Sequence, residues 1–164
     1  MLKIFLFFSL ILFGGCQTTK STLSSEYSGD CPTDGICVVT VYEDKSLNIL
    51  EDEFEAIYYT MVEKKESSVV HFKYYRNVDQ QYVDGHYTEE ILFEITNSTP
   101  LNLSDTALQE TKMIFGRHCF CKGQAGYYKV TSGTLNLINN KKGLQFTLDF
   151  KVKEVPQVIT FIKT

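Results

Sequence analysis

The residues best suited to chemistry lie in the stretch from Gly116 to Tyr128. His118, Cys119 and Cys121 place three nitrogen or sulfur ligands close together, as a zinc or copper site requires. Cys31 and Cys37 form a second closely spaced pair. Four cysteines in an exported domain favour structural disulfides, which is the leading interpretation. A metal site at His118, Cys119 and Cys121 is the alternative, and a redox-active pair of cysteines is the third interpretation. No Cys-x-x-Cys motif supports a thioredoxin-like reaction.

Three disulfide pairings are possible, and the spacing leaves them open. Cys31 and Cys37 flank a segment with a proline and an Asp-Gly turn, so a local bond forms easily there. Cys119 and Cys121 lie two residues apart, on one face of a strand, and a bond between them strains the ring. A crossed bond between the two pairs would close a loop of roughly 85 residues and contribute about 4 kcal/mol. The short Cys31–Cys37 loop would contribute about 2 to 3 kcal/mol.

Histidines and carboxylates elsewhere give no catalytic signature. His71 alternates with Val70 and Phe72, so we expect it on a solvated face. His86 follows a turn and is expected to form a local hydrogen bond. Glu89 and Glu90 are neighbours that would face opposite sides of a strand, so they cannot converge on one bond as glycosidases need. We expect them at a charged strand edge, and the sequence predicts no enzyme.

Tyrosine pairs are the main candidates for a binding surface. The chain has 10 Tyr and 12 Phe, and adjacent tyrosines on a strand send one ring to each face. Three outward rings on neighbouring strands could form a patch for a sugar or a protein, although cross-strand packing is the commoner explanation of such pairs. The residues are Tyr58, Tyr59, Tyr74, Tyr75, Tyr127 and Tyr128.

The N-terminus predicts export. An apolar run from Ile4 to Phe13 follows Lys3 and ends at Gly14, Gly15 and Cys16. The run is too short to span a hydrocarbon core of about 30 Å as a stable helix. Two small residues before a cysteine resemble the lipobox of bacterial lipoproteins, with Phe13 where leucine is usual. That resemblance implies cleavage before Cys16 and a covalent lipid on its thiol. The alternative is an ordinary cleaved signal peptide.

The lipobox divides the chain into a signal peptide (1–15), a lipidated tether (16–30) and one domain (31–164). Serine and threonine dominate residues 17–26, which predicts a flexible tether. Neither an aspartate after Cys16 nor an acidic export stretch is present. Their absence favours the periplasmic face of the outer membrane, with the lipid as the membrane contact and no other cofactor.

Charge excludes a dedicated nucleic-acid binder. The 164 residues carry a net charge of -4, with 43% hydrophobic residues, which fits one globular domain. Residues 26–110 hold 18 acidic and 5 basic side chains, whereas 111–164 hold 9 basic and 2 acidic ones. Either the two halves meet with complementary charges, or the molecule presents an acidic and a basic face to partners.

The domain that must position these residues is predicted to be all-β. We expect an antiparallel sandwich or small barrel of about eight or nine strands, with one short helix at most. Residues 144–152 alternate most cleanly between apolar and polar, and a hairpin joins them to 134–138. The one helix candidate is 104–110, with Ser104 as N-cap. The other expected strands are 36–42, 56–62, 69–75, 83–88, 90–95 and, at an edge, 158–162.

Several segments together resemble a group of small lipoproteins of flavobacteria, within the Bacteroidota. They are 31–37 (Cys-Pro-x-Asp-Gly-x-Cys), 84–90, 115–124 (Phe-Gly-Arg-x-Cys-Phe-Cys-Lys-Gly-Gln) and 154–157. The resemblance implies an envelope location and no particular activity. We therefore expect a non-enzymatic, lipid-anchored binding module for a protein or a glycan. The alternatives are the metal-binding protein described above and a periplasmic enzyme inhibitor of the lysozyme-inhibitor lipoprotein type.

Overall fold

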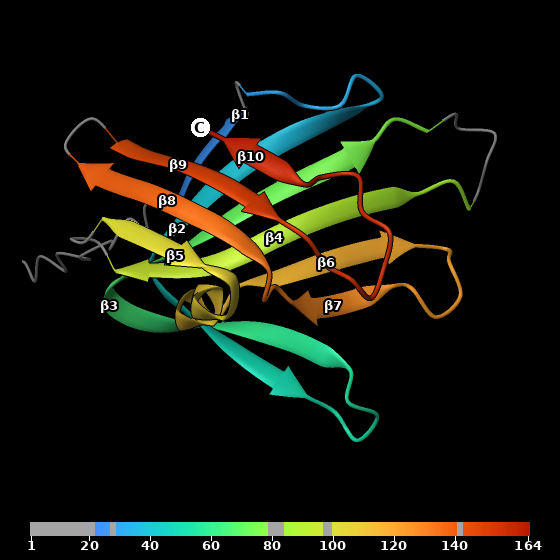
Figure 1. Ribbon diagram of the computed structural model, residues 1–164, viewed down its shortest axis with the longest axis horizontal. Coiled ribbons are helices and arrows are strands. Elements are labelled where there is room, and N and C mark those ends of the chain that lie inside the picture. Colours follow the sequence, from blue (N-terminus) through green and yellow to red (C-terminus); the bar gives the residue numbers. More distant parts are fainter. Residues whose placement is uncertain (1–21, 27–28, 79–83, 97–99, 141–142) are drawn as a thin grey trace, which may run out of the picture.

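A computed structural model describes residues 22–26, 29–78, 84–96, 100–140 and 143–164 of the chain (Figure 1). The fold is all-β, as predicted, with one short helix. The expected signal peptide and Cys16 lie outside these residues, as do residues 141 and 142 in the turn of the hairpin expected between 134–138 and 144–152. The elements are β1 (Thr22–Glu26), β2 (Gly35–Glu51), β3 (Ile57–Arg76), β4 (Tyr87–Thr96), β5 (Leu101–Ser104), η1 (Asp105–Thr111), β6 (Ile114–Cys119), β7 (Gly126–Lys129), β8 (Gly133–Asn140), β9 (Gly143–Phe150) and β10 (Phe161–Lys163).

The strands form two antiparallel sheets. One has six strands in the order β1-β2-β3-β4-β6-β7, and the other has four in the order β10-β9-β8-β5. A hydrophobic core between the sheets includes the expected alternating residues of β9, with Phe146, Leu148 and Phe150 buried. The ten strands among the described residues exceed the expected eight or nine because three short strands, β1, β5 and β7, have no counterpart among the expected ranges.

Strands β2 and β3 form one long hairpin that bends back over its own sheet (Figure 1). A bulge separates Glu43 from Lys45, and Asp44 and Glu66 adopt positive φ at 53° and 62°. The outer half of the hairpin then covers the outer face of β3, β4 and β6, where it closes a second hydrophobic core. Pairing of Ile57 with Tyr127 joins β3 to β7 and completes a small four-stranded barrel of β3, β4, β6 and β7.

The two expected strands 56–62 and 69–75 are therefore one continuous strand, β3. The charged residues 63–66 do not interrupt it, and two of them form ion pairs. Lys64 lies 2.6 Å from Glu94, and Glu63 lies 2.5 Å from Lys45. Because β4 runs between the sandwich core and the barrel core, its side chains are buried on both faces.

The one predicted helix is present at the expected position, and it is a 3-10 helix. Residues 105–111 form a 3-10 helix, η1, between β5 and β6. Ser104 takes the extended N-cap conformation without a side-chain capping bond. Gln109 ties the helix to the chain that follows it, because its amide nitrogen donates to the carbonyls of Met113 (2.8 Å) and Val130 (2.7 Å).

The chain ends also differ from the expectation. Within the range expected to be a tether, Thr22–Glu26 forms β1 and pairs with β2 from Tyr42 to Val38. The last strand is at a sheet edge, as expected, but it comprises only Phe161–Lys163. The backbone N–H groups of Val158 and Ile159 bind the carboxylate of Glu89 instead of a neighbouring strand.

Ion pairs join the acidic and basic halves of the chain. Lys112 lies 2.8 Å from Glu94, and Lys129 lies 2.6 Å from Glu51. At these two places the halves meet with complementary charges, which was the first of the two interpretations.

Candidate functional site

The cysteines form two local disulfides. Cys31 pairs with Cys37 and Cys119 with Cys121, at Cα–Cα distances of 5.8 and 5.3 Å. Of the three pairings left open, the crossed ones are wrong. A bond between Cys119 and Cys121 was expected to be strained if both lay within one strand. The bond forms because Cys119 ends β6 and the chain turns at Phe120.

The proposed metal ligands do not converge. Both sulfurs are in a disulfide, and His118 binds Glu90 on the face of β6 opposite Cys119. Within the part of the chain that the structure describes, no group of three or more His, Cys, Asp or Glu side chains is arranged to hold a metal.

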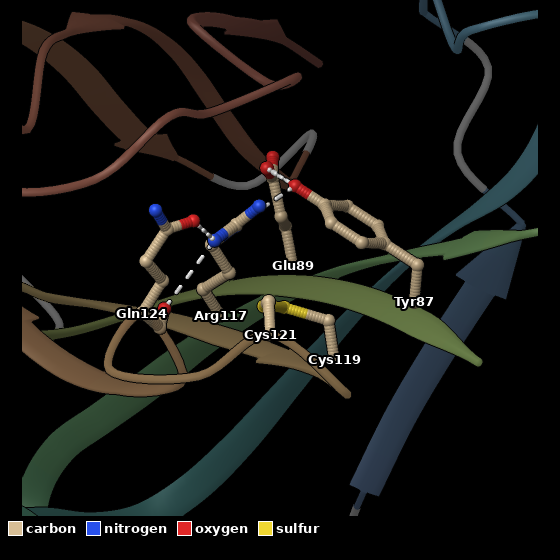
Figure 2. Close-up of a disulfide and its surroundings, with 6 residues drawn as sticks. All are labelled: Tyr87, Glu89, Arg117, Cys119, Cys121 and Gln124. Atoms are coloured by element: carbon tan, nitrogen blue, oxygen red, sulfur yellow. Dashed lines mark hydrogen bonds between the residues drawn. A yellow bond between two sulfur atoms is a disulfide. The ribbon is translucent and has the colours of Figure 1, made fainter. Parts of the chain in front are cut away.

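Glu89 is buried in the sandwich core, where it fixes the C-terminal segment (Figure 2). Its carboxylate accepts hydrogen bonds from the Tyr87 hydroxyl at 2.5 Å and from the N–H groups of Val158 and Ile159 at 2.7 Å each. The expectation of an exposed strand edge is wrong here, because segment 157–159 packs over β4 and covers the carboxylate.

Arg117 connects this carboxylate to the turn between β6 and β7 (Figure 2). Its Nε donates to the Tyr87 hydroxyl at 3.2 Å, and one terminal nitrogen donates to Gln124 Oε1 at 2.7 Å. Burial raises the pKa of Tyr87, so the hydroxyl stays protonated and can donate to Glu89. The turn that carries the second disulfide is thus held to β4.

Glu90 is buried in the barrel core, on the other face of β4. His71 Nε2 lies 2.6 Å from one oxygen, and His118 Nε2 lies 2.8 Å from the other. The Tyr127 hydroxyl also donates, at 2.5 Å. Burial alone would raise the pKa of Glu90, but the hydrogen bonds from His118, His71 and Tyr127 outweigh it and hold the pKa well below its usual range.

The alternation suggested that His71 is solvated, and this expectation is wrong because His71 is buried. The face it shares with Lys73 is covered by the folded-back hairpin, so an apparently polar face becomes a second interior. Both oxygens of Glu90 accept bonds from protein side chains, which ties β3, β4, β6 and β7 together. His86 forms a local contact as expected, with its Nε2 3.2 Å from Thr88 Oγ1.

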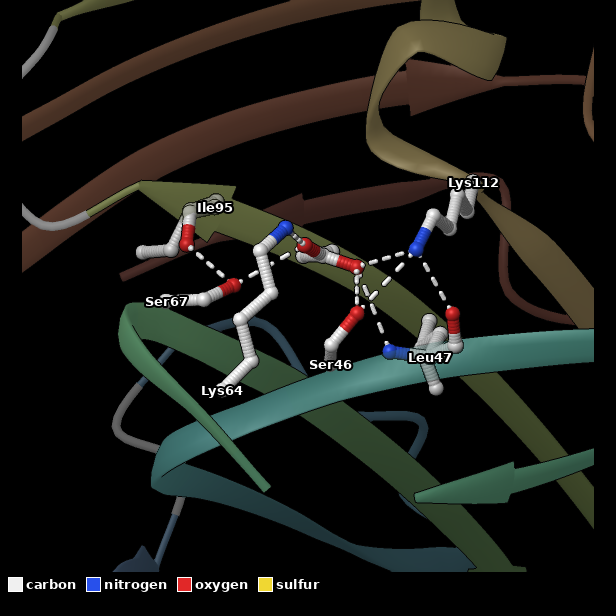
Figure 3. Close-up of polar contacts among 7 residues, drawn as sticks. Ser46, Leu47, Lys64, Ser67, Ile95 and Lys112 are labelled. Atoms are coloured by element: carbon white, nitrogen blue, oxygen red, sulfur yellow. Dashed lines mark hydrogen bonds and ion pairs between the residues drawn. The ribbon is translucent and has the colours of Figure 1, made fainter. Parts of the chain in front are cut away.

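A third buried carboxylate, Glu94, stabilises the bend of the hairpin (Figure 3). Burial alone would raise its pKa, but hydrogen bonds from Lys112, Lys64 and two serines lower the pKa to about 2. Lys112 also donates to the Leu47 carbonyl at 2.7 Å. The groups that donate to Glu94 are Ser46 (2.7 Å), the Leu47 N–H (3.2 Å), Lys64 (2.6 Å), Ser67 (2.9 Å) and Lys112 (2.8 Å).

The six tyrosines do not form one outward patch. Tyr59 and Tyr127 meet edge to face inside the barrel, with ring centroids 5.3 Å apart. Tyr74 is fully buried in the sandwich core, and Tyr128 is half-buried against it. Only Tyr58 and Tyr75 are exposed. Packing accounts for most of the set, which was the competing explanation.

Two phenylalanines that the sequence analysis did not single out are the most exposed large apolar side chains among the described residues. Phe54 is 80% exposed and Phe120 is 84% exposed. Each lies in a fixed turn. Asp52 Oδ1 accepts from the N–H groups of Phe54 (2.8 Å) and Ala56 (2.9 Å), and the disulfide brackets Phe120. The sequence did carry signals that could have found these exposed rings. Phe54 lies among acidic turn residues, and Phe120 lies between two cysteines.

Both turns lie at one end of the molecule, here called the loop end and defined by residues 52–56 and 119–125. Ile57, next to the first turn, pairs with Tyr127, next to the second. A pocket of about 410 Å³ lies between them, lined by Glu55–Ile57 and Ala125–Lys129 with Thr131 and Glu154. Thr22 pairs with Tyr42 at the opposite end, toward the bend of β2 and β3 (Figure 1).

Comparison with known proteins gives no relative: no family, curated protein or solved structure matches this chain. Among the described residues, no helix is long and apolar enough to cross a membrane.

Proposed function

We propose that this protein is a lipid-anchored protein of the bacterial envelope that binds another protein through its loop end, without catalytic turnover of that partner. The observation that carries the proposal is the exposure of Phe54 and Phe120 on two neighbouring, internally braced turns. Large aromatic side chains are typical anchors of protein interfaces, and here two of them lie on neighbouring turns.

The charge around Phe54 supports a protein with a basic rim as the partner. The turn reads Asp-Glu-Phe-Glu, and Glu53 and Glu55 are both exposed beside the ring. Complementary charges at the rim of an interface steer association and fix its orientation. An apolar socket with lysine or arginine around it would match this turn.

The position of the N-terminus supports binding away from the membrane. A lipid on Cys16 would be six residues from Thr22, a stretch that spans at most about 20 Å. Strand β1 pairs with the part of β2 that leads to the bend and, in Figure 1, lies away from the tip of the β2–β3 hairpin and from the β6–β7 turn. An anchored molecule would thus hold its loop end toward the periplasm, if the anchor is in the inner leaflet of the outer membrane.

The arrangement of the buried carboxylates supports a binding role over an enzymatic one. Glu89, Glu90 and Glu94 each accept several hydrogen bonds from the protein itself. Their oxygens hold segments of the fold together and do not face a shared cavity. Inhibition of a periplasmic enzyme is the second candidate, because a braced turn that projects Phe120 could enter the cleft of an enzyme.

Lipidation is tested by growing cells with a fatty-acid analogue. Label is expected on the wild type and absent from Cys16→Ala. Unlabelled wild type, or label that persists in Cys16→Ala, contradicts the anchoring part of the proposal.

Partner binding is tested by crosslinking in intact envelopes. The double variant Phe54→Ala/Phe120→Ala is expected to lose the crosslinked species that the wild type forms. Ile138→Ala is the matched control, because Ile138 is also an exposed apolar residue but lies in β8 near its turn to β9, away from the loop end. Equal crosslinking by all three proteins contradicts the proposed surface.

A further inference from the structure

The two disulfides differ in exposure. Cys37 is only 3% exposed in the sandwich core, whereas both Cys119 and Cys121 are partly exposed. Cys31 and Cys119 are each partly buried against that core. The Cys119–Cys121 bond instead flanks the exposed ring of Phe120. With Phe120 and Lys122, the two cysteines line an open hollow of about 480 Å³ at the loop end. Another molecule can therefore approach either cysteine of the second disulfide, whereas in the first only Cys31 borders a hollow, of about 320 Å³, and Cys37 is buried.

The second disulfide also contributes less than the first to the stability of the fold. A bond between residues two apart constrains very little of the unfolded chain, so its entropic stabilisation is small. The turn is fixed independently by Arg117, which binds Tyr87 and Gln124, and by the Gln124 N–H, which donates to the Cys121 carbonyl at 3.1 Å. Opening this bond would leave β6 and β7 in place.

Cationic side chains accompany the sulfur atoms. Lys122 follows Cys121 and is exposed at the same hollow. Arg117 lies two residues before Cys119, on the same face of β6. Nearby cations favour a thiolate over a thiol, which makes a cysteine a better leaving group. Disulfides that are exposed are generally the labile or regulatory ones.

We propose that the Cys119–Cys121 disulfide is redox-active and oxidises a pair of cysteine thiols on another envelope protein. A thiolate of that protein attacks one sulfur of the bond, and the electron pair leaves on the other sulfur as a thiolate. The second thiolate of that protein then attacks its own sulfur in the mixed disulfide. It leaves with a new disulfide, and Cys119 and Cys121 remain as a dithiol that has taken up its two electrons and two protons.

This reaction goes beyond partner binding and does not require it, because any accessible dithiol is a substrate in principle. The exposed Phe120 would provide an apolar contact for the peptide around the attacking cysteine. Cys31–Cys37 serves as an internal control in every measurement.

The first test titrates the full-length protein, in detergent micelles, with reduced and oxidised glutathione. Differential alkylation and mass spectrometry then report each disulfide separately. Cys119–Cys121 is expected to be half-reduced at a ratio of [GSH]² to [GSSG] at least about tenfold lower than Cys31–Cys37, without change in the circular dichroism spectrum. Reduction of both bonds together, or opening of Cys119–Cys121 only as the fold is lost, overturns the proposal.

The second test mixes the oxidised protein, without oxygen, with a synthetic peptide that contains two reduced cysteines. Wild type is expected to oxidise about one peptide per molecule, by the stoichiometry of the exchange. The variant Cys119→Ser/Cys121→Ser, which retains Cys31–Cys37, is expected to oxidise none. Equal oxidation by both proteins, or none by the wild type, overturns the proposal. The glutathione titration needs no variant, so it decides the question even if the double variant folds poorly.

Discussion

Glu89 and Glu90 are neighbours in β4, and each carboxylate is buried in a different interior of the protein. Glu89 faces the sandwich core, where it binds the backbone of Val158 and Ile159. Glu90 faces the barrel core, where it binds His71 and His118. The two charges are separated by the sheet itself. Glu89 holds the covering C-terminal segment in place, and Glu90 ties β3, β4 and β6 together. One strand thus links the packing of the two cores.

Replacing Glu89 with alanine is expected to lower the free energy of unfolding by roughly 3 to 5 kcal/mol. The change leaves two backbone N–H groups without an acceptor and removes the negative charge near the buried Arg117. Urea denaturation of the variant and the wild type measures the difference.

Glu53→Ala is the matched control for Glu89→Ala, because Glu53 is an exposed carboxylate in a turn. Its effect should stay within about 0.5 kcal/mol. A loss of less than about 1 kcal/mol for Glu89→Ala would mean that water replaces the carboxylate, and that Glu89 does not fix the C-terminal segment.

The sandwich could be predicted from the sequence because strands such as β9 bury one face only. Residues 144–152 alternate without interruption, and the structure buries the apolar set. The barrel could not be predicted in the same way. Its interior faces carry His71, Glu90 and Glu94, which look like a solvated face until the outer half of the β2–β3 hairpin folds over them. The folded-back half is held by long-range contacts, namely the ion pairs of Glu94 and the second hydrophobic core, and such contacts leave no local pattern.

The candidate site was only partly visible in the sequence for a related reason. The stretch around Cys119 and Cys121 was singled out by its residue types, and it lies at the loop end. Phe54 was missed because one phenylalanine in an acidic turn has no periodicity. Only the pairing of Ile57 with Tyr127 brings its turn beside the second disulfide.

Acid is expected to destabilise the protein through Glu94. Its pKa is lowered to about 2 in the folded state, from an ordinary value of 4.5 in the unfolded chain. The stabilisation is therefore fully present above pH 5 and is lost as the pH falls toward 2. Urea denaturation at pH 7, 5, 4 and 3 should show a smaller pH dependence for Glu94→Gln than for the wild type. Parallel curves for the two proteins would contradict the assigned role.

Gly116 is required because β6 passes very close to the barrel core. A Cβ at this position would lie 2.6 Å from a ring carbon of Tyr127 and 2.9 Å from Cγ of Glu90. Gly116→Ala is expected to cost about 1 to 3 kcal/mol, as overpacked sites do, with the Glu90 hydrogen bonds disturbed as well. Gly123→Ala is the comparison, because nothing lies within 4 Å of its added Cβ and only its φ of 70° is unfavourable. Thermal denaturation should give the larger loss for Gly116→Ala, and the reverse order would contradict the packing described.

Asp52 is expected to control the rigidity of the turn that exposes Phe54. Its carboxylate binds the N–H groups of Phe54 and Ala56, so Asp52→Ala removes both bonds without touching a core. The global cost should be about 1 kcal/mol, but local opening of the turn should become easier. Chymotrypsin, which cleaves after aromatic residues, should then cut at Phe54 several-fold faster than in the wild type. Cleavage after Tyr75, which is exposed near the end of β3, gives the control rate and should not change. Equal acceleration at both sites would show global destabilisation, and unchanged cleavage at Phe54 would show that Asp52 does not brace the turn.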